Sequence, residues 1–218
     1  DPLKCISGHK YSNCTGAPLY GWEIKVYNAT TMVLNGTSTT DEKGYWQVCG
    51  LLPGAYFVNE TIQPGWQNLH PSQTVTLGCD NLTGVNFRND PLKCISGHKY
   101  SNCTGAPLEG WEIKVYNATT MVLNGTSTTN ATGYWQVCGL VPGAYFVNET
   151  LKPGWRNLHP NQTVTLGCEN KTGVNFRNDH LKCISGHKYS NCTGEPLSGW
   201  QIKVYNATTM VLNGTSTT

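Results

Sequence analysis

The most frequent chemically distinctive pattern in this sequence is the triplet Asn-x-Thr, the acceptor for N-linked glycans. It occurs fifteen times in 218 residues. Asn and Thr are also good turn and strand residues, so some triplets can be incidental, and a glycan requires an exposed asparagine. The density of the triplets predicts a glycosylated protein, with acceptors at Asn13, Asn28, Asn35, Asn59, Asn81, Asn102, Asn117, Asn124, Asn130, Asn148, Asn161, Asn170, Asn191, Asn206 and Asn213.

Cysteine is the second residue type that could do chemistry, with ten in the chain. So many cysteines indicate an oxidising compartment and therefore disulfide bonds. Cys5 and His9 are types that also bind zinc, but their placement along a strand and the oxidising setting argue against a zinc site. We expect no metal and no cofactor apart from covalent glycans.

The remaining composition excludes several classes of function. Charged residues make up 13% of the chain and the net charge is +2, which indicates neither a nucleic-acid partner nor a membrane surface. No apolar run is long enough to cross a bilayer. No phosphate-binding loop or nucleophile motif is present, so we do not expect an enzyme. The sequence begins at Asp1 without a signal peptide, and we interpret it as a mature or excised piece of a longer protein.

The chain consists of an 89-residue repeat. The string "LKCISGHKYSNCTG" begins at residues 3, 92 and 181, which gives two full copies, 1–89 and 90–178, and a partial copy, 179–218. The full copies differ at eleven positions. Replacement of Leu52 and Ile62 by other apolar residues is expected of positions in or near a core. Such uniform copies favour a fibre or stalk over an enzyme.

Alternation of apolar and polar residues, interrupted by Gly, Pro and Asn, predicts seven strands in each full copy. In the first copy we place them at 4–11, 22–28, 32–39, 45–49, 55–62, 74–79 and 85–89. This number of strands predicts an all-β protein, with immunoglobulin-like or prealbumin-like β-sandwiches in a linear array. The residues expected to face inward are Ile6, Gly8, Lys10, Trp22, Ile24, Val26, Trp46, Val48, Tyr56, Val58, Glu60, Val75, Leu77, Val85, Phe87 and Asn89.

The partial copy contains only the first three of these strands. Three strands without a partner sheet cannot bury their apolar face, so we do not expect an independent domain there. Either the sequence is a window from a longer array, or another segment completes the fold.

The strand directions place the cysteines at opposite ends of the sandwich. We call the end where the first strand begins the start pole and the other the end pole. Cys5, Cys49 and Cys79 fall at the start pole and Cys14 at the end pole, so a disulfide between Cys5 and Cys14 would span too great a distance. One pattern joins Cys49 to Cys79 within the repeat and Cys14 to the next repeat; the competing pattern is Cys5–Cys79 with Cys14–Cys49. The first pattern gives Cys49–Cys79, Cys138–Cys168, Cys14–Cys94 and Cys103–Cys183.

Four segments resemble one family in the same order. They are "ISGHKY", "GEPLSGW" at 194–200, "GYWQVCGLLPGAYFVNE" and "VNFRN". Together they resemble SD-repeat and collagen-adhesin B-type modules, the prealbumin-like domains of prokaryotic cell-surface proteins. The dense sequons suit an archaeal or a eukaryotic exterior, and the resemblance to this module family favours an archaeal source. The resemblance implies a stalk or spacer on a cell surface. Many relatives carry an acidic calcium loop after the first strand, but "YSNCTGAPL" has no carboxylate, so calcium is not expected here.

The resemblance also implies a possible covalent crosslink. Collagen-adhesin B-type domains can form an amide between a first-strand Lys and a last-strand Asn, helped by a Glu in a Tyr-x-x-x-Glu segment. A buried neutral Lys is a nucleophile, and a buried protonated Glu can polarise the amide. The alternative is a buried Lys–Glu ion pair, and SD-repeat relatives share these residues generally without the bond. The candidate residues are Lys10, Glu60 and Asn89, with Lys99, Glu149 and Asn178 in the second repeat.

These observations favour a structural repeat of a glycosylated, disulfide-stabilised extracellular fibre, sheath or surface-layer stalk. Its expected partners are identical repeats and chains in a homopolymeric fibre on the cell surface. The alternative is an adhesin or carbohydrate-binding module, for which loop aromatics such as Tyr20, Trp66 and Trp155 would supply the contacts. A binder usually diversifies its loops, whereas these loops are nearly uniform.

Overall fold

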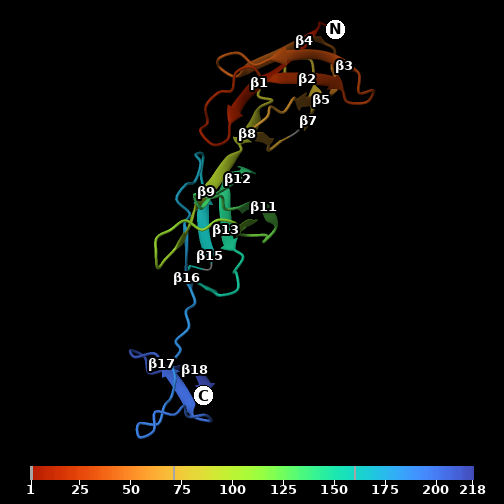
Figure 1. Cartoon of the computed structure of the whole chain (residues 1–218). Coiled ribbons are helices and arrows are strands. Elements are labelled where there is room, and N and C mark those ends of the chain that lie inside the picture. The colour runs from red at the N-terminus through yellow and green to blue at the C-terminus, as the bar shows by residue number, and fades with distance from the viewer. Residues whose placement is uncertain (1, 71, 160) are drawn as a thin grey trace. The chain divides into compact units, whose positions relative to one another are not determined.

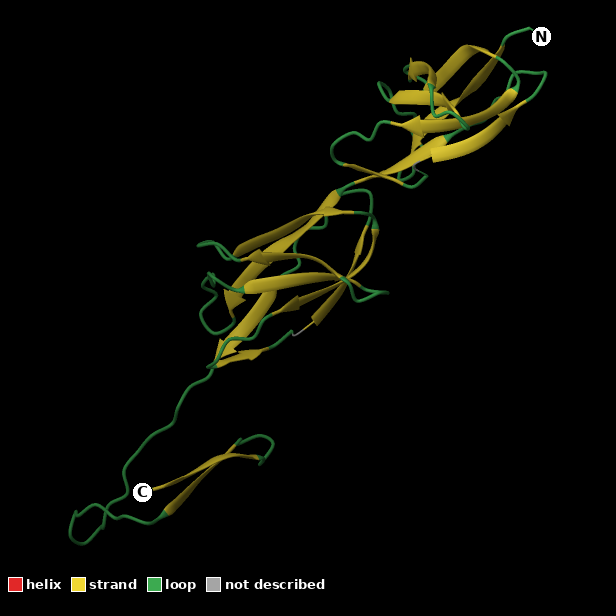
Figure 2. Cartoon of the chain, turned by 90° about the vertical axis from the view of Figure 1, so that its right-hand side faces the viewer, coloured by secondary structure: helices red, strands yellow, loops and turns green. Residues whose placement is uncertain are grey.

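The computed structural model describes residues 2–70, 72–159 and 161–218. All regular elements in these residues are β-strands, and the described chain contains no helix able to cross a membrane. The chain forms two compact units, one that ends at His180 and a small one at Leu181–Thr218. The first unit holds two β-sandwiches, one from each full repeat (Figures 1 and 2).

The first sandwich packs two four-stranded sheets against each other. One sheet has the order β4-β1-β8-β6 and the other β3-β2-β5-β7. The first and last long strands, β1 and β8, are parallel neighbours, whereas the other pairs are antiparallel. The strands are β1 Lys4–Ser12, β2 Glu23–Asn28, β3 Leu34–Thr39, β4 Tyr45–Leu51, β5 Gly54–Glu60, β6 Trp66–Asn68, β7 Ser72–Leu77 and β8 Phe87–Pro91.

The second sandwich has the same topology, with sheets β12-β9-β16-β14 and β11-β10-β13-β15. Only Leu92 separates β8 of the first sandwich from β9 of the second. Its strands are β9 Lys93–Ser101, β10 Glu112–Asn117, β11 Leu123–Thr128, β12 Tyr134–Leu140, β13 Gly143–Glu149, β14 Trp155–Asn157, β15 Asn161–Leu166 and β16 Phe176–His180.

The core of each sandwich lies between its two sheets, as the alternation predicts. Every residue expected to face inward in the first repeat is buried except Val75, which is partly buried against the core. Trp46 is central: its ring is fully buried and its indole N–H donates to the backbone oxygen of Val85 at 3.2 Å. The indole nitrogen is the only polar atom of this side chain. Because it is hydrogen-bonded, the whole side chain can be buried without leaving an unpaired donor.

Three details of the sequence prediction need correction. The short strands β6 and β14 were not expected, because three residues carry too little alternation to show a period. Leu51 is 2% exposed and belongs to the core. By contrast, Leu52 and Ile62 are 57% and 54% exposed, so conservation of apolar volume there does not reflect burial.

Gly8 explains why an inward position on β1 carries no side chain. A Cβ built there would lie 1.8 Å from the backbone oxygen of Val85. The segment that contains Val85 runs parallel to β1 and beside it: Leu82 forms a parallel bridge with Ile6, and the backbone N–H of Val85 donates to the backbone oxygen of Ser7 at 3.1 Å. Only glycine allows this close backbone approach.

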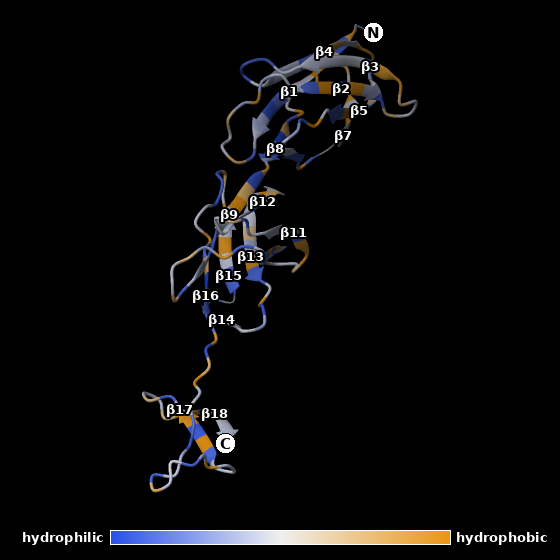
Figure 3. Cartoon of the chain, in the orientation of Figure 1, coloured by the Kyte–Doolittle hydropathy of each residue, from blue (hydrophilic) through white to orange (hydrophobic). Residues whose placement is uncertain are grey.

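The partial third copy forms only the hairpin of β17 Gln201–Tyr205 and β18 Leu212–Thr217. The expected first strand, the counterpart of 4–11, does not form, because the described chain offers no counterpart of β4 or β8 to pair with it. Apolar and polar residues still alternate along β17 (Figure 3), but the side chain of Ile202 on its apolar face is 43% exposed. Trp200 is 54% exposed, whereas its counterpart Trp22 is 2% exposed.

Candidate functional site

A lysine, a glutamate and an asparagine meet in the interior of the first sandwich. Lys10 lies near the end of β1, and Asn89 lies on the neighbouring strand β8, two positions beyond the residue paired with Lys10. Glu60 is the last residue of β5 and comes from the opposite sheet. Residues that alternate inward on three strands of two sheets are thus brought to one point near the end pole.

The group is withdrawn from water. Lys10 and Asn89 are fully buried, and Glu60 is 4% exposed. Lys10 Nζ lies 2.7 Å from Glu60 Oε2, and both side chains have no solvent-accessible surface. Lys10 Nζ also lies 4.5 Å from the ring centre of Trp22, which covers the amine from one side. This role of Trp22 is not predicted from the sequence, where the alternation marks it only as an inward-facing residue.

Burial shifts both ionisable groups toward their neutral forms. It lowers the pKa of the Lys10 amine, an effect that the neighbouring Glu60 carboxylate only partly offsets. Burial raises the pKa of the Glu60 carboxyl, while Lys10 and then the Asn89 amide act in the opposite direction. Desolvation penalises the charged form of an acid and of a base alike, so a neutral amine beside a protonated acid becomes accessible.

The polar atoms of the group lack satisfactory hydrogen bonds. Among the described residues, neither the amide of Asn89 nor the carboxylate oxygens of Glu60 have a partner with acceptable hydrogen-bond geometry. The same holds for Lys10 Nζ, despite its proximity to Glu60. Unsatisfied buried groups are costly and rare in native proteins. The arrangement is chemically suited to an attack of the amine on the asparagine side-chain carbonyl, with Glu60 as proton donor.

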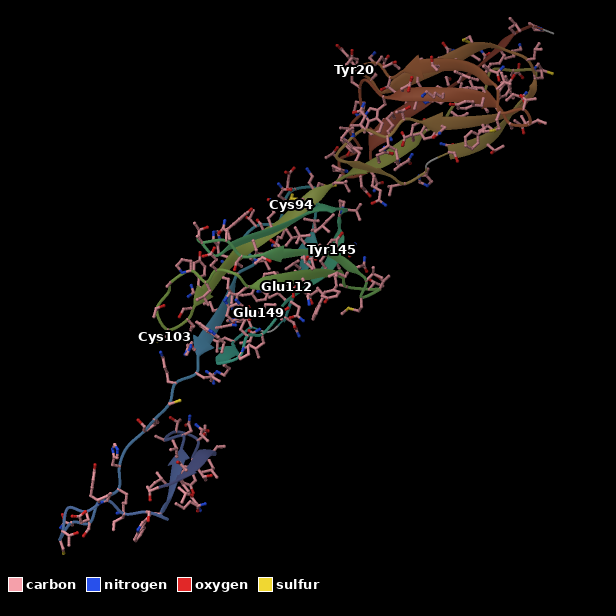
Figure 4. The ribbon with its side chains drawn as sticks, turned by 45° about the vertical axis from the view of Figure 1, so that its right-hand side comes forward. Tyr20, Cys94, Cys103, Glu112, Tyr145 and Glu149 are labelled. Atoms are coloured by element: carbon pink, nitrogen blue, oxygen red, sulfur yellow. A yellow bond between two sulfur atoms is a disulfide. The ribbon has the colours of Figure 1, made fainter. Side chains whose placement is uncertain are left out.

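The second sandwich repeats the arrangement. Lys99 Nζ lies 2.6 Å from Glu149 Oε2, and both side chains are fully buried. Asn178 is also fully buried, and neither of its amide atoms has a hydrogen-bond partner among the described residues. Lys99 Nζ lies 4.5 Å from the ring centre of Trp111. Figure 4 labels Glu149 within this sandwich.

The cysteines pair differently from the sequence prediction. Cys5 is bonded to Cys49, and the equivalent Cys94 is bonded to Cys138. The predicted bonds Cys49–Cys79, Cys138–Cys168 and Cys14–Cys94 are therefore wrong, as is the competing pair Cys5–Cys79 with Cys14–Cys49. The reason is sheet order: β1 and β4 are antiparallel neighbours, so Cys5 and Cys49 lie side by side on the outer face, and Cys5 is unavailable to zinc. The predicted bond Cys103–Cys183 is also absent, since both thiols are free.

One disulfide joins the two repeats. Cys14, in the loop after β1 of the first sandwich, is bonded to Cys168, in the loop after β15 of the second, with 5.5 Å between their Cα atoms. The assignment of cysteines to poles predicted a bond from Cys14 to the next repeat but chose the wrong partner. Because Cys94 is occupied by its neighbour on β12, Cys168 is the cysteine left at the start pole of the second sandwich.

The structure places all fifteen sequon asparagines where they are exposed or partly exposed. Asn28 accepts backbone hydrogen bonds from Thr30 and Thr31 through Oδ1, which leaves Nδ2, the atom that carries a glycan, directed away from that turn. In contrast, Asn13 Nδ2 donates to Asp90 Oδ1 at 3.0 Å, and Asn102 repeats this contact with Asp179. Asn13 and Asn102 are therefore the least suitable acceptors.

Two of the three loop aromatics pack on buried tryptophans of the sandwiches. The ring of Trp66 packs edge-to-face on Trp22 at 5.7 Å between centres, and Trp155 packs on Trp111 in the same way at 5.5 Å. Tyr20 is 71% exposed. Among the described residues no group of three or more acidic, histidine or cysteine side chains could hold a metal ion.

Several solved structures resemble this chain. The Streptococcal ancillary pilin matches with a TM-score of 0.44 at 20% identity, over 80% of this chain and 62% of its own. The Bacillus anthracis TIE protein matches with a TM-score of 0.39 at 16% identity, and this chain spans 42% of its length. The shaft pilin SpaA from Lactobacillus rhamnosus GG matches with a TM-score of 0.42 at 15% identity, over 84% of this chain and 100% of its own.

No curated protein matches the sequence. The sequence model of the SpaA prealbumin-like fold domain matches residues 4–91 and again residues 93–180. These two segments coincide with the two sandwiches, each from its first strand to its last. The chain therefore belongs to the SpaA family of prealbumin-like fold domains and carries two such domains in tandem.

Proposed function

We propose that this chain is a structural segment of an extracellular fibre, sheath or surface-layer stalk on the surface of an archaeal cell. The observation that carries the proposal is the Cys14–Cys168 bond, which gives two nearly identical sandwiches a second covalent connection besides the chain itself. A binding or catalytic protein has no need to fix the junction between identical units in this way, whereas an array that must stay stiff does. The single residue between β8 and β9 serves the same purpose.

Immunogold electron microscopy of intact cells tests this proposal. An antibody against a peptide shared by both repeats should label filaments or a surface layer at regular intervals along their length. Label confined to filament tips would indicate an adhesin, and label inside the cell would contradict the proposal.

We further propose that each sandwich closes an internal amide, Lys10 to Asn89 in the first and Lys99 to Asn178 in the second. The neutral Lys amine attacks the Asn side-chain carbonyl carbon while Glu60 or Glu149 donates a proton to the carbonyl oxygen. The resulting carboxylate takes a proton from the attacking nitrogen and passes it to the leaving nitrogen. As the C–N bond to the leaving nitrogen breaks, the carbonyl forms again and its proton returns to the carboxylate. One C–N bond forms, one breaks, and ammonia leaves, so no oxidant or cofactor is required. Burial, the short Lys–Glu contact and the unsatisfied amide support this chemistry.

Glycans on the Asn-x-Thr sites are the third part of the proposal. The exposure of these asparagines supports it, and so does the repetition of the sites on the β2–β3 hairpin and its counterparts. In the first hairpin Asn28 and Asn35 flank Met32, Val33 and Leu34, which are 53%, 60% and 48% exposed. Sugars on both sides would shield this apolar tip from unspecific contacts.

Site occupancy in native protein can be measured by glycopeptide mass spectrometry. Asn35 is exposed and should be fully occupied. Asn13 should be occupied to a clearly lower fraction, because its Nδ2 is engaged by Asp90. Substitution of Asp90 by Ala should raise the occupancy of Asn13. Unmodified asparagines throughout would contradict the glycan proposal but not the amide.

The exposed apolar tip also favours a second candidate function, binding of a partner protein by the hairpin. Met121, Val122 and Leu123 repeat it with exposed fractions of 54%, 59% and 48%. Replacing Met32 and Val33 with Ser in both full repeats should leave fibres unchanged if the tip is merely shielded. Loss of adhesion by cells whose fibres remain intact would favour the binding function.

A further inference from the structure

Two free thiols in the chain occupy the same positions as the two bonded thiols of the junction. Cys103 is the counterpart of Cys14, and Cys79 is the counterpart of Cys168; each pair is 89 residues apart. Cys14 and Cys168 are joined, whereas Cys79 and Cys103 are free and exposed. The chain thus contains both cysteines of one junction and a single cysteine of each of two further junctions.

The Cys103 loop already has the conformation that the bonded loop adopts. The backbone N–H of Asn102 donates to the backbone oxygen of Asn178 at 2.8 Å, as that of Asn13 donates to the backbone oxygen of Asn89 at 2.9 Å. Its side chain holds Asp179 as Asn13 holds Asp90. These contacts exist with and without the disulfide, so the loop presents Cys103 at the end pole of the second sandwich before any bond forms (Figure 4).

The Cys79 loop matches the bonded Cys168 loop in the same way. Cys5 donates its backbone N–H to Asn81 Oδ1 at 2.9 Å and accepts from the backbone N–H of Leu82 at 2.9 Å. In the second sandwich Cys94 makes the equivalent contacts with Asn170 and Lys171. Both halves of the junction are therefore preorganised, which lowers the entropic cost of forming the bond.

We propose that Cys103 and Cys79 are the two halves of this same junction and form disulfides with neighbouring repeats. Cys103 pairs with the Cys79-type cysteine of the repeat that follows, and Cys79 pairs with the Cys14-type cysteine of the repeat that precedes. The neighbouring repeat belongs either to the same polypeptide or to a second copy of this chain. This inference goes beyond the proposed function, because it concerns the junction and holds with or without glycans and internal amides.

The chemistry is thiol–disulfide exchange with a low-molecular-weight disulfide such as oxidised glutathione. One protein thiolate attacks the glutathione disulfide and releases one reduced glutathione. The second protein thiolate then attacks the mixed disulfide and releases the other. Two protein thiols are oxidised to one disulfide, and one glutathione disulfide is reduced to two thiols.

The experiment compares two proteins refolded in glutathione buffer. The first is the 218-residue chain with Cys183→Ser and Cys192→Ser, in which Cys79 and Cys103 are the remaining free thiols and can pair only between molecules. The second is the chain extended after Thr218 by a copy of residues 41–89, which completes the third sandwich and supplies a Cys79-type cysteine in the same polypeptide. Non-reducing peptide maps then locate each disulfide.

The repeats can be distinguished in these maps, because the Cys103 peptide contains Glu109 where the Cys14 peptide contains Tyr20. The expected result is a Cys103 peptide linked to a Cys79-type peptide, and its loss in Cys103→Ser. If the Cys103 disulfide forms only in the extended chain, its partner cysteine belongs to the same polypeptide. If the first protein forms a ladder of multimers, the partner cysteine belongs to a second copy of the chain. The Cys14–Cys168 peptide in each sample shows that oxidation succeeded. If Cys103 remains fully alkylatable in both proteins while that control bond is present, the proposal is wrong.

Discussion

The substitution Glu60→Gln separates a covalent crosslink from a buried ion pair. If the amide forms, the wild-type chain has lost one ammonia molecule per sandwich. After reduction of the disulfides, the intact mass of unglycosylated protein is then lower than the sequence mass by two ammonia molecules. A Gln at position 60 cannot relay the proton, so the first sandwich should keep its full mass. Its Lys10 and Asn89 would then stay in separable peptides.

The size of the stability change follows from the loop that the amide closes. Lys10 and Asn89 are far apart along the chain, but the Cys5–Cys49 disulfide already provides a shorter path between them. This path runs from Lys10 back to Cys5, across the disulfide to Cys49 and on to Asn89, and it spans about 45 residues. An amide that closes this loop lowers the conformational entropy of the unfolded state, which stabilises the fold by about 4 kcal/mol. For a domain of this size that corresponds to a loss of roughly 20–30 °C in melting temperature.

Differential scanning calorimetry with intact-mass measurement provides the assay. Glu149→Gln should lower the melting temperature of the second sandwich to the same extent. Glu23→Gln is the matched surface control: Glu23 lies 3.0 Å from Lys25, but both side chains are substantially exposed, and the melting temperature should hardly change. A wild-type chain with its full sequence mass would refute the crosslink and leave the ion pair as the correct interpretation.

The pH dependence of Asn89→Ala adds an independent measurement, since this variant keeps Lys10 and Glu60 but cannot form the amide. The lowered pKa of Lys10 means that the native state binds fewer protons than the unfolded state, so stability falls as pH decreases from about 10.5 through the native pKa. The raised pKa of Glu60 has the opposite sign: stability falls as pH rises from about 4.5 through the native value. Stability should therefore pass through a minimum between these two ranges. A crosslinked wild type has no titrating Lys10 and should lack the alkaline limb.

Two further predictions concern the scaffold. Gly8→Ala should cost at least about 3 kcal/mol or prevent folding, because its Cβ would overlap the Val85 oxygen, whereas Gly78→Ala meets no atom within 4 Å and should be well tolerated, as thermal melts of both will show. Replacing both Cys5 and Cys49 with Ser should cost up to about 4 kcal/mol in an uncrosslinked sandwich, because a loop of 44 residues is released, and denaturant titration would contradict this if the midpoint did not move.

The sequence predicted what depends on local alternation and failed where the answer depends on which strands are neighbours. Lys10, Glu60 and Asn89 are buried as expected, because the period of two fixes the face of each residue regardless of sheet order. The partner of Cys5 could not be found in this way. Cys49 lies next to Cys5 only because β4 pairs with β1, and no local pattern in the sequence indicates that pairing. The T-shaped packing of Trp66 on Trp22 is likewise a long-range contact.

The two covalent systems of the array would resist different kinds of deformation. With the proposed amide in place, tension along the chain passes down β1 to Lys10, crosses to Asn89 on the parallel neighbour β8 and continues into β9, so residues between the two ends of the amide carry no load. The Cys14–Cys168 disulfide joins segments that lie outside this path in both sandwiches. It therefore adds nothing to tensile strength while the amides are intact, but it fixes a second point of the junction and so restrains bending at Leu92. Reduction of the disulfides should accordingly increase the flexibility of the array without lowering the force needed to extend it, a separation that single-molecule stretching of native fibres can measure.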